Sequence, residues 1–265
     1  MEASEKYALV TGASSGIGWH ISEELAKRGY SIIAVSNQPT QLLDLQVKLE
    51  KLYPIHVLTL DIDLAQEESP IRVFNFCKEN KLTIETLVNN AGIFFFGEVT
   101  KVDYDRVKSI IALHILTPAL LCRLFGEQMA ENGKGYILNI SSITAVMPYP
   151  GISLYAPTKA FIRHFTRSLR SEMKLDKVNV TCLMPGATDT SLYNTGNLNI
   201  SLLKKLGLMK KPEDVAKEGL KALFSNRAVC IPGFMNKLVV LLVPLVPRFI
   251  IEAITRRTSV IRKIN

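Results

Sequence analysis

The chain has 265 residues, of which 48% are hydrophobic and 21% charged, and its formal net charge is +8. This length and composition suit one globular core, so we expect a single domain over residues 1–265 and not a fibrous or disordered chain. The four cysteines are scattered without Cys-x-x-Cys spacing, which argues against a metal site and against disulfide bonds. The chain starts with a short acidic stretch and not with a signal peptide, so a cytoplasmic protein is expected.

Strand-length apolar runs alternate with helical patterns along the chain. The first run, Tyr7–Thr11, ends at a glycine-rich turn, and a helical pattern follows over Ile21–Arg28. Further strands are predicted at Ser31–Val35, His56–Leu60, Thr86–Asn89, Tyr136–Ile140, Asn179–Leu183 and Ala228–Ile231. Helices are predicted at Gln41–Leu52, Glu67–Glu79, Asp103–Ala130, Ala156–Lys174 and Pro212–Phe224. This alternation predicts a doubly wound α/β Rossmann fold, with a mostly parallel seven-stranded sheet and helices on both faces.

The glycine-rich turn reads Thr-Gly-Ala-Ser-Ser-Gly-Ile-Gly over residues 11–18. Gly12 permits a tight turn, while Gly16 and Gly18 let a pyrophosphate approach the backbone and let the helix pack close to the sheet. The helix N-terminus favours the negative charge of that pyrophosphate. Further hydroxyl and amide donors are predicted at Ser14, Ser15 and Ile17. Because a strand precedes the turn and a helix follows it, we expect a bound dinucleotide.

Tyr155 and Lys159 are one helical turn apart and follow Ser142 in the sequence. A tyrosine hydroxyl titrates near ~10, so it exchanges protons poorly at neutral pH unless a cation stabilises its phenolate. Lys159 supplies that cation from the same helix face, and Ser142 can donate a hydrogen bond to the same substrate oxygen. Singly, such residues are more often an ordinary aromatic and a solvated lysine. Together with the glycine turn they predict a redox site, since a carbonyl that receives a hydride needs a proton donor.

Two more motifs each follow a predicted strand: Asn-Asn-Ala-Gly at residues 89–92, and Pro-Gly at residues 185–186. In order and spacing, all these motifs resemble those of the classical short-chain dehydrogenase/reductase (SDR) family, in its 3-oxoacyl reductase-like group. The resemblance runs from about Tyr7 to Gly186 and more loosely to Gly233. It implies an NAD(P)(H)-dependent oxidoreductase that transfers a hydride between nicotinamide and a carbonyl or secondary alcohol.

The resemblance also implies roles for individual residues. Tyr155 is the acid/base, Lys159 lowers its pKa and binds the nicotinamide ribose, and Ser142 orients the carbonyl. Family members usually form homodimers or homotetramers through the fourth and fifth helices, predicted here at 103–130 and 156–174. The implied cofactor contacts form three groups. Asp63 and Leu64 lie beside the adenine, and Asp61 is the alternative for that position. Asn90, Ala91 and Gly92 face the adenosine, and Pro185, Gly186, Thr188 and Thr190 cover the nicotinamide and phosphate.

The end of the second strand normally separates NAD enzymes of this family from NADP enzymes. An acid there holds the ribose hydroxyls of NAD, whereas Arg or Lys binds the extra phosphate of NADP. This chain has Ser36, Asn37 and Gln38 at that place. No carboxylate repels the phosphate and three neutral groups can bond it, so NADP is the preferred cofactor and NAD the alternative. The residues also fit a simple polar turn.

His114 departs from the family pattern. The segment Ile110–Pro118 aligns with the place where the family has an asparagine that holds a water in a proton relay, and His114 stands at that asparagine's position. No asparagine lies between Asn90 and Asn132, so a shift of the alignment does not restore the match. A histidine can hold water through either ring nitrogen and pass protons near neutral pH. We therefore take His114 as a fourth candidate catalytic residue, the alternative being a histidine that only packs.

The segments expected to line the substrate cleft are apolar. They are residues 145–151, the three phenylalanines at 94–96, and the loop 189–211. A hydrophobic ketone, aldehyde or acyl chain is therefore favoured over a free sugar. Two alternatives remain: a non-catalytic dinucleotide-binding sensor or scaffold, and a lipid reductase at a membrane surface.

The C-terminal extension, residues 234–265, is apolar and basic. Residues 204–265 hold 13 Lys/Arg but only 4 Asp/Glu, and Leu238–Pro247 is too short and too rich in proline to span a bilayer of ~20 helical residues. We expect this segment to cover the cleft or a subunit contact. The alternative is a peripheral membrane or acidic carrier contact that uses Arg256, Arg257, Arg262 and Lys263. No aromatic-basic pattern or reader motif indicates nucleic acid.

Overall fold

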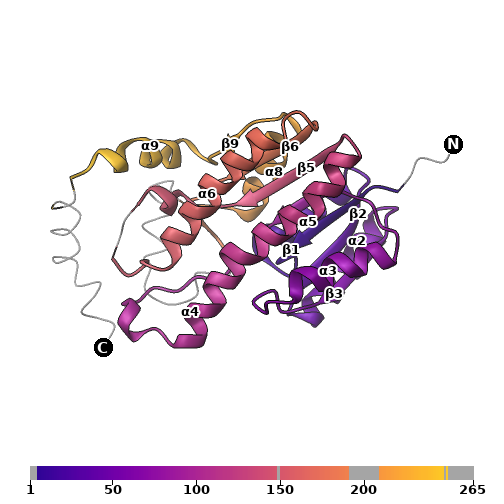
Figure 1. The fold of residues 1–265 in the computed structure, drawn as a ribbon, viewed down its shortest axis with the longest axis horizontal. Coiled ribbons are helices and arrows are strands. Elements are labelled where there is room, and N and C mark those ends of the chain that lie inside the picture. The colour runs from indigo at the N-terminus through magenta and orange to yellow at the C-terminus, as the bar shows by residue number, and fades with distance from the viewer. Residues whose placement is uncertain (1–4, 148–149, 191–208, 248, 250–265) are drawn as a thin grey trace.

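The computed structural model describes residues 5–147, 150–190, 209–247 and 249 (Figure 1). Within these residues, seven strands form one sheet in the order β3-β2-β1-β4-β5-β6-β9, and all neighbouring strands are parallel. The strands are β1 (Tyr7–Thr11), β2 (Ser31–Ser36), β3 (Val57–Asp61), β4 (Ile84–Asn89), β5 (Gly135–Ile140), β6 (Val178–Leu183) and β9 (Val229–Cys230). The predicted doubly wound Rossmann fold is confirmed, and its sheet is wholly parallel.

Helices cover both faces of this sheet (Figure 1). On one face lie α1 (Gly16–Ala26), α2 (Pro39–Leu52) and α8 (Pro212–Phe224). On the other lie α3 (Ser69–Glu79), α5 (Thr117–Glu131) and α6 (Tyr155–Glu172). The remaining helical segments are η1 (Val99–Lys101), α4 (Tyr104–Ile111), η2 (Ala112–Leu116), η3 (Ile143–Val146), α9 (Phe234–Leu242) and η5 (Val243–Leu245).

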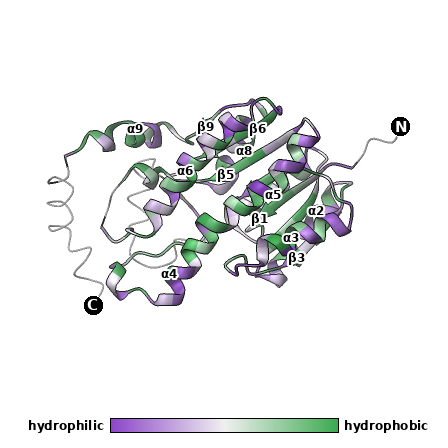
Figure 2. Cartoon of the chain, viewed as in Figure 1, coloured by the Kyte–Doolittle hydropathy of each residue, from purple (hydrophilic) through white to green (hydrophobic). Residues whose placement is uncertain are grey.

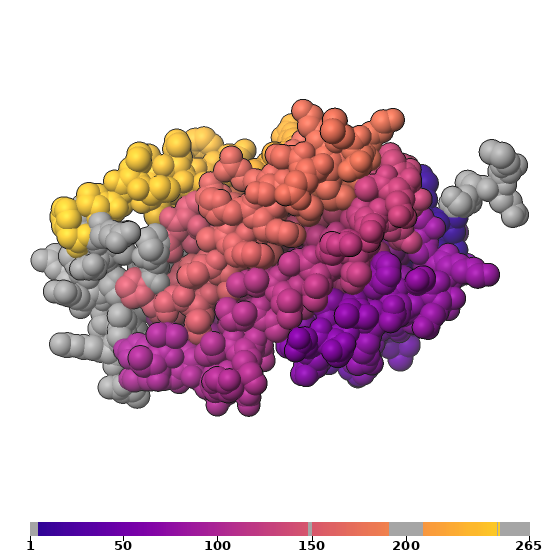
Figure 3. All heavy atoms as spheres, in the orientation of Figure 1, coloured from indigo at the N-terminus to yellow at the C-terminus, as the bar shows by residue number. Residues whose placement is uncertain are grey.

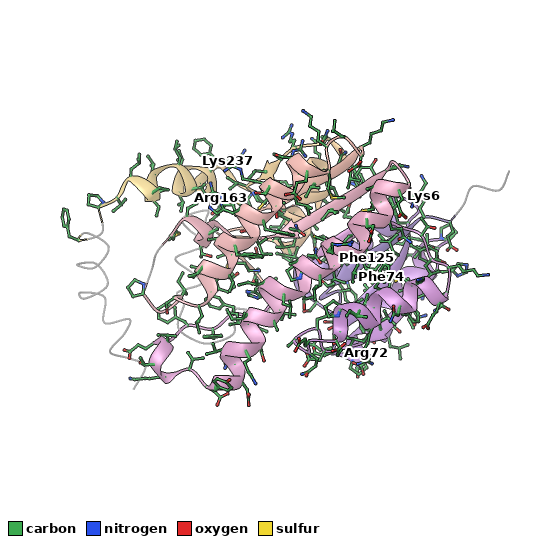
Figure 4. All side chains as sticks on the ribbon, in the orientation of Figure 1. Lys6, Arg72, Phe74, Phe125, Arg163 and Lys237 are labelled. Atoms are coloured by element: carbon green, nitrogen blue, oxygen red, sulfur yellow. The ribbon has the colours of Figure 1, made fainter. Side chains whose placement is uncertain are left out.

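The sheet separates two hydrophobic cores, because successive strand residues point to opposite faces. Ala8 and Val10 of β1 belong to the core under α1, α2 and α8, whereas Leu9 belongs to the core under α3 and α5. All three are fully buried, and Figure 2 shows the strands as mainly hydrophobic. In the second core, Phe74 and Phe125 meet edge to face with ring centroids 5.2 Å apart (Figure 4). Each such buried side chain stabilises the fold by roughly 1.5–3 kcal/mol.

The predicted helix over residues 103–130 forms as three consecutive segments, α4, η2 and α5. In η2 the ladder has π-helical spacing, and the N–H of Thr117 bonds the carbonyl of Ala112. Pro118 has no N–H to give to the carbonyl of His114, so a regular α-helical ladder is interrupted at this point. By length and composition, Tyr104–Glu131 is long and apolar enough to cross a membrane. Its C-terminal part nevertheless packs on α3, β4 and β5, as a core helix does.

The strands end at one edge of the sheet, and the predicted motifs lie there. After β6, β7 (Ala187–Thr188) pairs in parallel with β8 (Met209–Lys210), which holds the two ends of the predicted substrate loop together. Residues 191–208 of that loop lie outside the described residues, as do residue 248 and residues 250–265 of the predicted C-terminal extension, including its four basic residues. The expectation of one domain over the whole chain stays a prediction.

Candidate active site

The glycine turn is held by the segment that follows β4. Thr11 Oγ1 donates to the carbonyl of Val88 (3.2 Å) and accepts from the backbone N–H groups of Asn90 (2.9 Å) and Ala91 (3.0 Å). The Asn90 side-chain amide donates to the carbonyls of Thr11 (2.9 Å) and Gly12 (3.1 Å). Gly12 has φ +64°, and a Cβ there would lie 2.9 Å from the Ala91 Cα. The two motifs therefore fix each other, and residue 12 must be glycine.

Gly16 and Gly18 are required for different reasons. At Gly16, where φ is +55°, a Cβ would lie 2.9 Å from Thr190 Cγ2, so the segment after β7 covers the turn. At Gly18 a Cβ would lie 2.1 Å from the carbonyl oxygen of Gly12. Gly18 thus lets α1 pack against the turn, which agrees with the packing role expected for it.

A cleft of about 690 Å³ lies along the carboxyl ends of the strands. That volume is typical of a small-molecule site. Its walls include every predicted catalytic and cofactor-binding residue except Gly18: Gly12, Ser14, Ser15, Gly16, Ile17, Ser36, Asn37, Asp63, Leu64, Asn90, Ala91, Gly92, His114, Ser142, Tyr155, Lys159, Pro185, Gly186, Thr188 and Thr190. These residues follow different strands, so the fold alone brings them together. Their individual roles stay predictions.

The cleft wall at the end of β2 is polar and uncharged. Ser14 Oγ and Ser36 Oγ lie 2.9 Å apart, which joins the glycine turn to β2. Asn37 and Gln38 continue the wall. Among the described residues, the lysine and arginine of the cleft wall are Lys159 and Arg106, and both come from other elements.

The structure distinguishes Asp63 from Asp61, the two candidates for the adenine position. Asp63 lies in the cleft wall beside Leu64, whereas Asp61, the last residue of β3, lies outside it. Asp63 Oδ1 accepts from the N–H of Ala65 (3.0 Å), which orders the turn after β3. The geometry therefore favours Asp63 for the adenine position.

Tyr155 and Lys159 open α6 and are almost fully buried, with 5% and 6% of their surface exposed. Lys159 Nζ lies 5.6 Å from the centroid of the Tyr155 ring and donates to the carbonyl of Ile140 (3.1 Å). Ser141 Oγ donates to the carbonyl of Lys159 (2.7 Å), so the end of β5 holds the helix. Phe94 packs edge-on against Tyr155, with centroids 4.9 Å apart. The expected placement of the cation beside the phenol ring is present.

Burial lowers the pKa of Lys159 from 10.5 to about 8. Loss of hydration disfavours the charged ammonium, and a single backbone carbonyl restores only part of it. The group is still protonated at neutral pH. Its charge therefore acts on the neighbouring phenol across a short, poorly hydrated distance, where electrostatic attraction is stronger than in water.

Ser142 lies at the end of β5 and caps η3. Its Oγ accepts from the N–H of Thr144 (3.1 Å), and the residue is 4% exposed. Because that bond uses the oxygen as acceptor, the hydroxyl proton can be donated to a group in the cleft.

His114 lies in the cleft wall, but both of its ring nitrogens are bonded to protein. Nε2 lies 3.0 Å from the N–H of Ile93 and accepts from it, which places the ring proton on Nδ1, 2.9 Å from Thr158 Oγ1. Thr158 Oγ1 in turn donates to the carbonyl of Tyr155 (2.8 Å). Burial, and then the charge of Lys159, lower the pKa of His114 well below 6.5, so the ring is neutral. The geometry argues against a ring that holds water and passes protons near neutral pH, and it supports the alternative of a packed, bonded histidine.

Four residues that the sequence analysis did not identify line the cleft from α4 and η2: Asp105, Arg106, Ser109 and Leu113, of which the last three face it together. Their spacing of three and four residues puts them on one helix face, which is the signal that could have found them. Asn236 of α9 was missed as well. It is buried, and a Cβ at Gly186 would lie 2.4 Å from its Oδ1, so the start of α9 packs against the Pro185-Gly186 segment.

The fold and these motifs define the class of protein. Residues 6–199 match the family model for short chain dehydrogenase. The chain belongs to the short-chain dehydrogenase/reductase family, whose members are nicotinamide-dependent oxidoreductases, and the resemblance to its 3-oxoacyl reductase-like group is confirmed.

Individual proteins show the same relationship. The chain is 34% identical over 187 residues to very-long-chain 3-oxoacyl-CoA reductase-A of Danio rerio, covering 68% of this chain and 57% of that protein. It is 29% identical over 234 residues to 17-beta-hydroxysteroid dehydrogenase type 3 of Homo sapiens, covering 85% and 70%. A short-chain dehydrogenase from Sphingobium yanoikuyae, solved in complex with NADPH, has a TM-score of 0.78 and 26% identity, covering 86% and 87%. The chain spans only 57% to 61% of the 3-oxoacyl-CoA reductases that it matches.

Proposed function

We propose that this protein is an NAD(P)(H)-dependent oxidoreductase that transfers a hydride between nicotinamide and the carbonyl or secondary alcohol of a hydrophobic substrate. One observation carries the proposal: the glycine turn, Ser142, Tyr155 and Lys159 line a single cleft. The residues also fit a dinucleotide, because Gly12, Ser14, Ser15 and Gly16 line the cleft at the N-terminus of α1, where the helix favours the negative charge of a pyrophosphate.

The side chains of the cleft divide the proton chemistry between them. A bound nicotinamide supplies or accepts the hydride. Tyr155 gives a proton to the carbonyl oxygen during reduction and takes it back during oxidation. Lys159 stabilises the phenolate that this transfer leaves behind, and its bond to Ile140 keeps the ammonium in place. Ser142 donates to the same substrate oxygen and so orients the carbonyl.

A substrate panel tests the activity. Wild-type protein is mixed with NADPH or NADH and with acyl thioesters, bulky ketones, aldehydes and free sugars, and loss of reduced-nicotinamide absorbance is followed. We expect turnover of the hydrophobic carbonyl compounds and none of the sugars. If NADPH binds but no carbonyl compound is reduced and no alcohol is oxidised, the alternative of a dinucleotide sensor or scaffold replaces the proposal.

The apolar substrate preference is supported by an apolar cluster that packs around Tyr155, although the three phenylalanines at 94–96, which were predicted to line the cleft, are not among the residues of the cleft wall. Phe95, Ile110 and Ile152 form a buried cluster with Tyr155, and the half-buried Phe94 and Phe96 pack against it. Apolar and aromatic side chains of this kind favour a hydrophobic ligand. The names of the relatives, which refer to very-long-chain acyl groups and to a steroid, agree with this preference.

We further propose that NADP is preferred over NAD. Ser36, Asn37 and Gln38 offer neutral hydrogen-bonding groups at the end of β2, and the carboxylates that the described residues contribute to the cleft wall, Asp63 and Asp105, come from other segments. The NADPH complex of the Sphingobium yanoikuyae enzyme, one relative by structure, is consistent with this preference. Fluorescence titration with NADPH and NADH separates the two cofactors.

A second candidate function is lipid reduction at a membrane surface, and α9 favours it. Phe234, Leu241, Leu245 and Phe249 are 66% to 75% exposed, and the atoms of α9 lie on the outside of the molecule (Figure 3). Exposed apolar side chains that are followed in the sequence by basic residues suit an anionic lipid surface. Flotation with phosphatidylserine vesicles is the test: Leu241→Glu together with Leu245→Glu should abolish co-flotation, whereas Leu43→Glu on the distant α2 should not.

The proposed oligomer follows the expectation from the family. We propose a homodimer or homotetramer through α5 and α6, where the half-buried rings of Phe161 and Phe165 stack with centroids 5.6 Å apart. Sedimentation of the wild type and of Phe165→Glu tests this contact.

We also propose a cytoplasmic location, because Cys77, Cys122, Cys182 and Cys230 are free.

A further inference from the structure

Helix α4 presents a polar face to the cleft, two turns before His114. Asp105, Arg106, Ser109 and Leu113 all belong to the cleft wall. Leu113 is half-buried, whereas Arg106 is exposed. A ligand that extends out of the cleft along this face therefore meets a guanidinium.

The guanidinium of Arg106 is positioned by an aromatic ring. Its central carbon lies 4.7 Å from the centroid of Phe95, a distance suited to a cation–π contact. Phe95 belongs to the same apolar cluster as Tyr155, and Phe94 connects the two by packing edge-on against Tyr155. Arg106 is thus joined, through Phe95, to the apolar cluster that contains Tyr155. Thr11, Asn90 and Ala91 instead support the glycine turn on the cofactor side.

The guanidinium of Arg106 has no carboxylate partner among the described residues. None of the ion pairs in this part of the chain includes Arg106, although Asp105 lies next to it in sequence. The other cation of the cleft wall, Lys159, is already bonded to Ile140. Arginine binds carboxylate and phosphate groups with two parallel hydrogen bonds, and a ring beneath it holds the planar group in one orientation.

We propose that Arg106 binds an anionic group, a phosphate or a carboxylate, carried by the hydrophobic substrate at the end remote from the reacting carbonyl. The proposal rests on the proposed oxidoreductase function and narrows its substrate class to amphipathic carbonyl compounds. The apolar part lies against Ile93 and Leu113 of the cleft wall, and the anionic part lies at Arg106.

The test compares three substrates that share one acyl chain: a 3-oxoacyl-CoA, which carries phosphates, an oxo-fatty acid, which carries a carboxylate, and the neutral N-acetylcysteamine thioester. Arg106→Gln should lower kcat/KM for one or both anionic substrates about 10-fold, mainly through KM, and leave the neutral thioester unchanged. Arg106→Lys should retain part of the preference. Lys108→Gln, on the same helix but outside the cleft wall, is the matched control and should change nothing.

Three outcomes overturn the proposal. An equal loss for neutral and anionic substrates means that Arg106 only supports the Phe95 wall. A weaker NADPH affinity in Arg106→Gln, with unchanged substrate KM, assigns the guanidinium to a cofactor phosphate. No change with any substrate leaves Arg106 without a binding role. Failure of the wild type to reduce all three compounds is distinct from these, since it contradicts the oxidoreductase function itself.

Discussion

The cofactor side and the substrate side of the cleft are built in different ways. On the cofactor side, the Asn90 amide donates to the carbonyls of Thr11 and Gly12, Thr11 Oγ1 accepts from the N–H of Asn90, and glycine is required where backbone segments touch. On the substrate side, the wall includes side chains such as those of Arg106 and Leu113, and Arg106 packs on the ring of Phe95. A substitution on the cofactor side disturbs the fold, whereas a substitution on the substrate side alters which substrates the cleft can bind. The motifs therefore indicate the chemistry, and the substrate depends on side chains outside them.

The largest effect is expected at Lys159, where the two sides meet. Lys159→Met should lower turnover by at least ~100-fold and also weaken cofactor binding, because the ammonium is expected to act on the phenol and on the ribose. Steady-state kinetics and NADPH titration measure the two effects. Lys108→Met, a cation outside the cleft wall, is the control. Unchanged cofactor affinity in Lys159→Met would mean that Lys159 acts on the Tyr155 phenol and does not bind the ribose.

Burial of the same lysine should appear in the pH dependence of stability. The pKa of Lys159 is about 8 in the fold and 10.5 without burial. Below pH 8 the lysine is charged in both states, so the fold bears the full cost of burial. Between these values the unfolded chain holds the proton that the fold has released, so stability rises with pH, by on the order of 3 kcal/mol in total. Denaturant unfolding of the wild type and Lys159→Met from pH 7 to 10.5 should therefore diverge. If the free energy of unfolding changes with pH in the same way in both proteins, burial does not lower the pKa of Lys159.

His114 tests whether the cofactor-side scaffold positions the catalytic helix. His114→Asn should retain most activity, since an amide can bond Ile93 and Thr158, whereas His114→Leu should lose about 10-fold by leaving the Ile93 N–H without its acceptor. The wild type should show no step in kcat near pH 6.5, because burial keeps the pKa of His114 well below that value. A step in kcat near pH 6.5 that is present in the wild type and absent in His114→Asn would support His114 as a proton relay that titrates. Equal damage by asparagine and leucine would mark a residue that only packs.

The smallest effect is expected at Asn37, where the cofactor side depends on a side chain. Asn37→Asp should reverse the preference from NADPH to NADH by several-fold, because a carboxylate repels the extra phosphate and accepts from the ribose hydroxyls. Asn37→Ser is the neutral control. Fluorescence titration measures both affinities, and an unchanged ratio would place the discriminating contacts elsewhere.

The sequence predicted the sheet and the motif residues well because each depends on a local pattern. Buried strands are apolar runs, and the residues at 11–18, 89–92 and 155–159 have fixed spacing. It was less successful at helix boundaries: α1 begins at Gly16, not at Ile21, because the turn runs directly into the helix, and Pro118 divides the predicted helix over 103–130.

Long-range contacts explain the remaining differences. The bonds of His114 to Ile93 and Thr158 join segments far apart in the chain, so the sequence could not show that its ring nitrogens are used. The stacking of Arg106 on Phe95 likewise depends on how α4 packs on the segment after β4.

Tyr155→Phe tests the central claim most directly. The variant removes one hydroxyl and keeps the ring that packs against Phe94. Oxidation of NADPH is followed with a hydrophobic carbonyl substrate, and NADPH affinity is measured by fluorescence on the same preparation. The account predicts that turnover falls by at least ~100-fold while the affinity stays nearly unchanged. Retained turnover, with the affinity unchanged, would contradict Tyr155 as the acid/base.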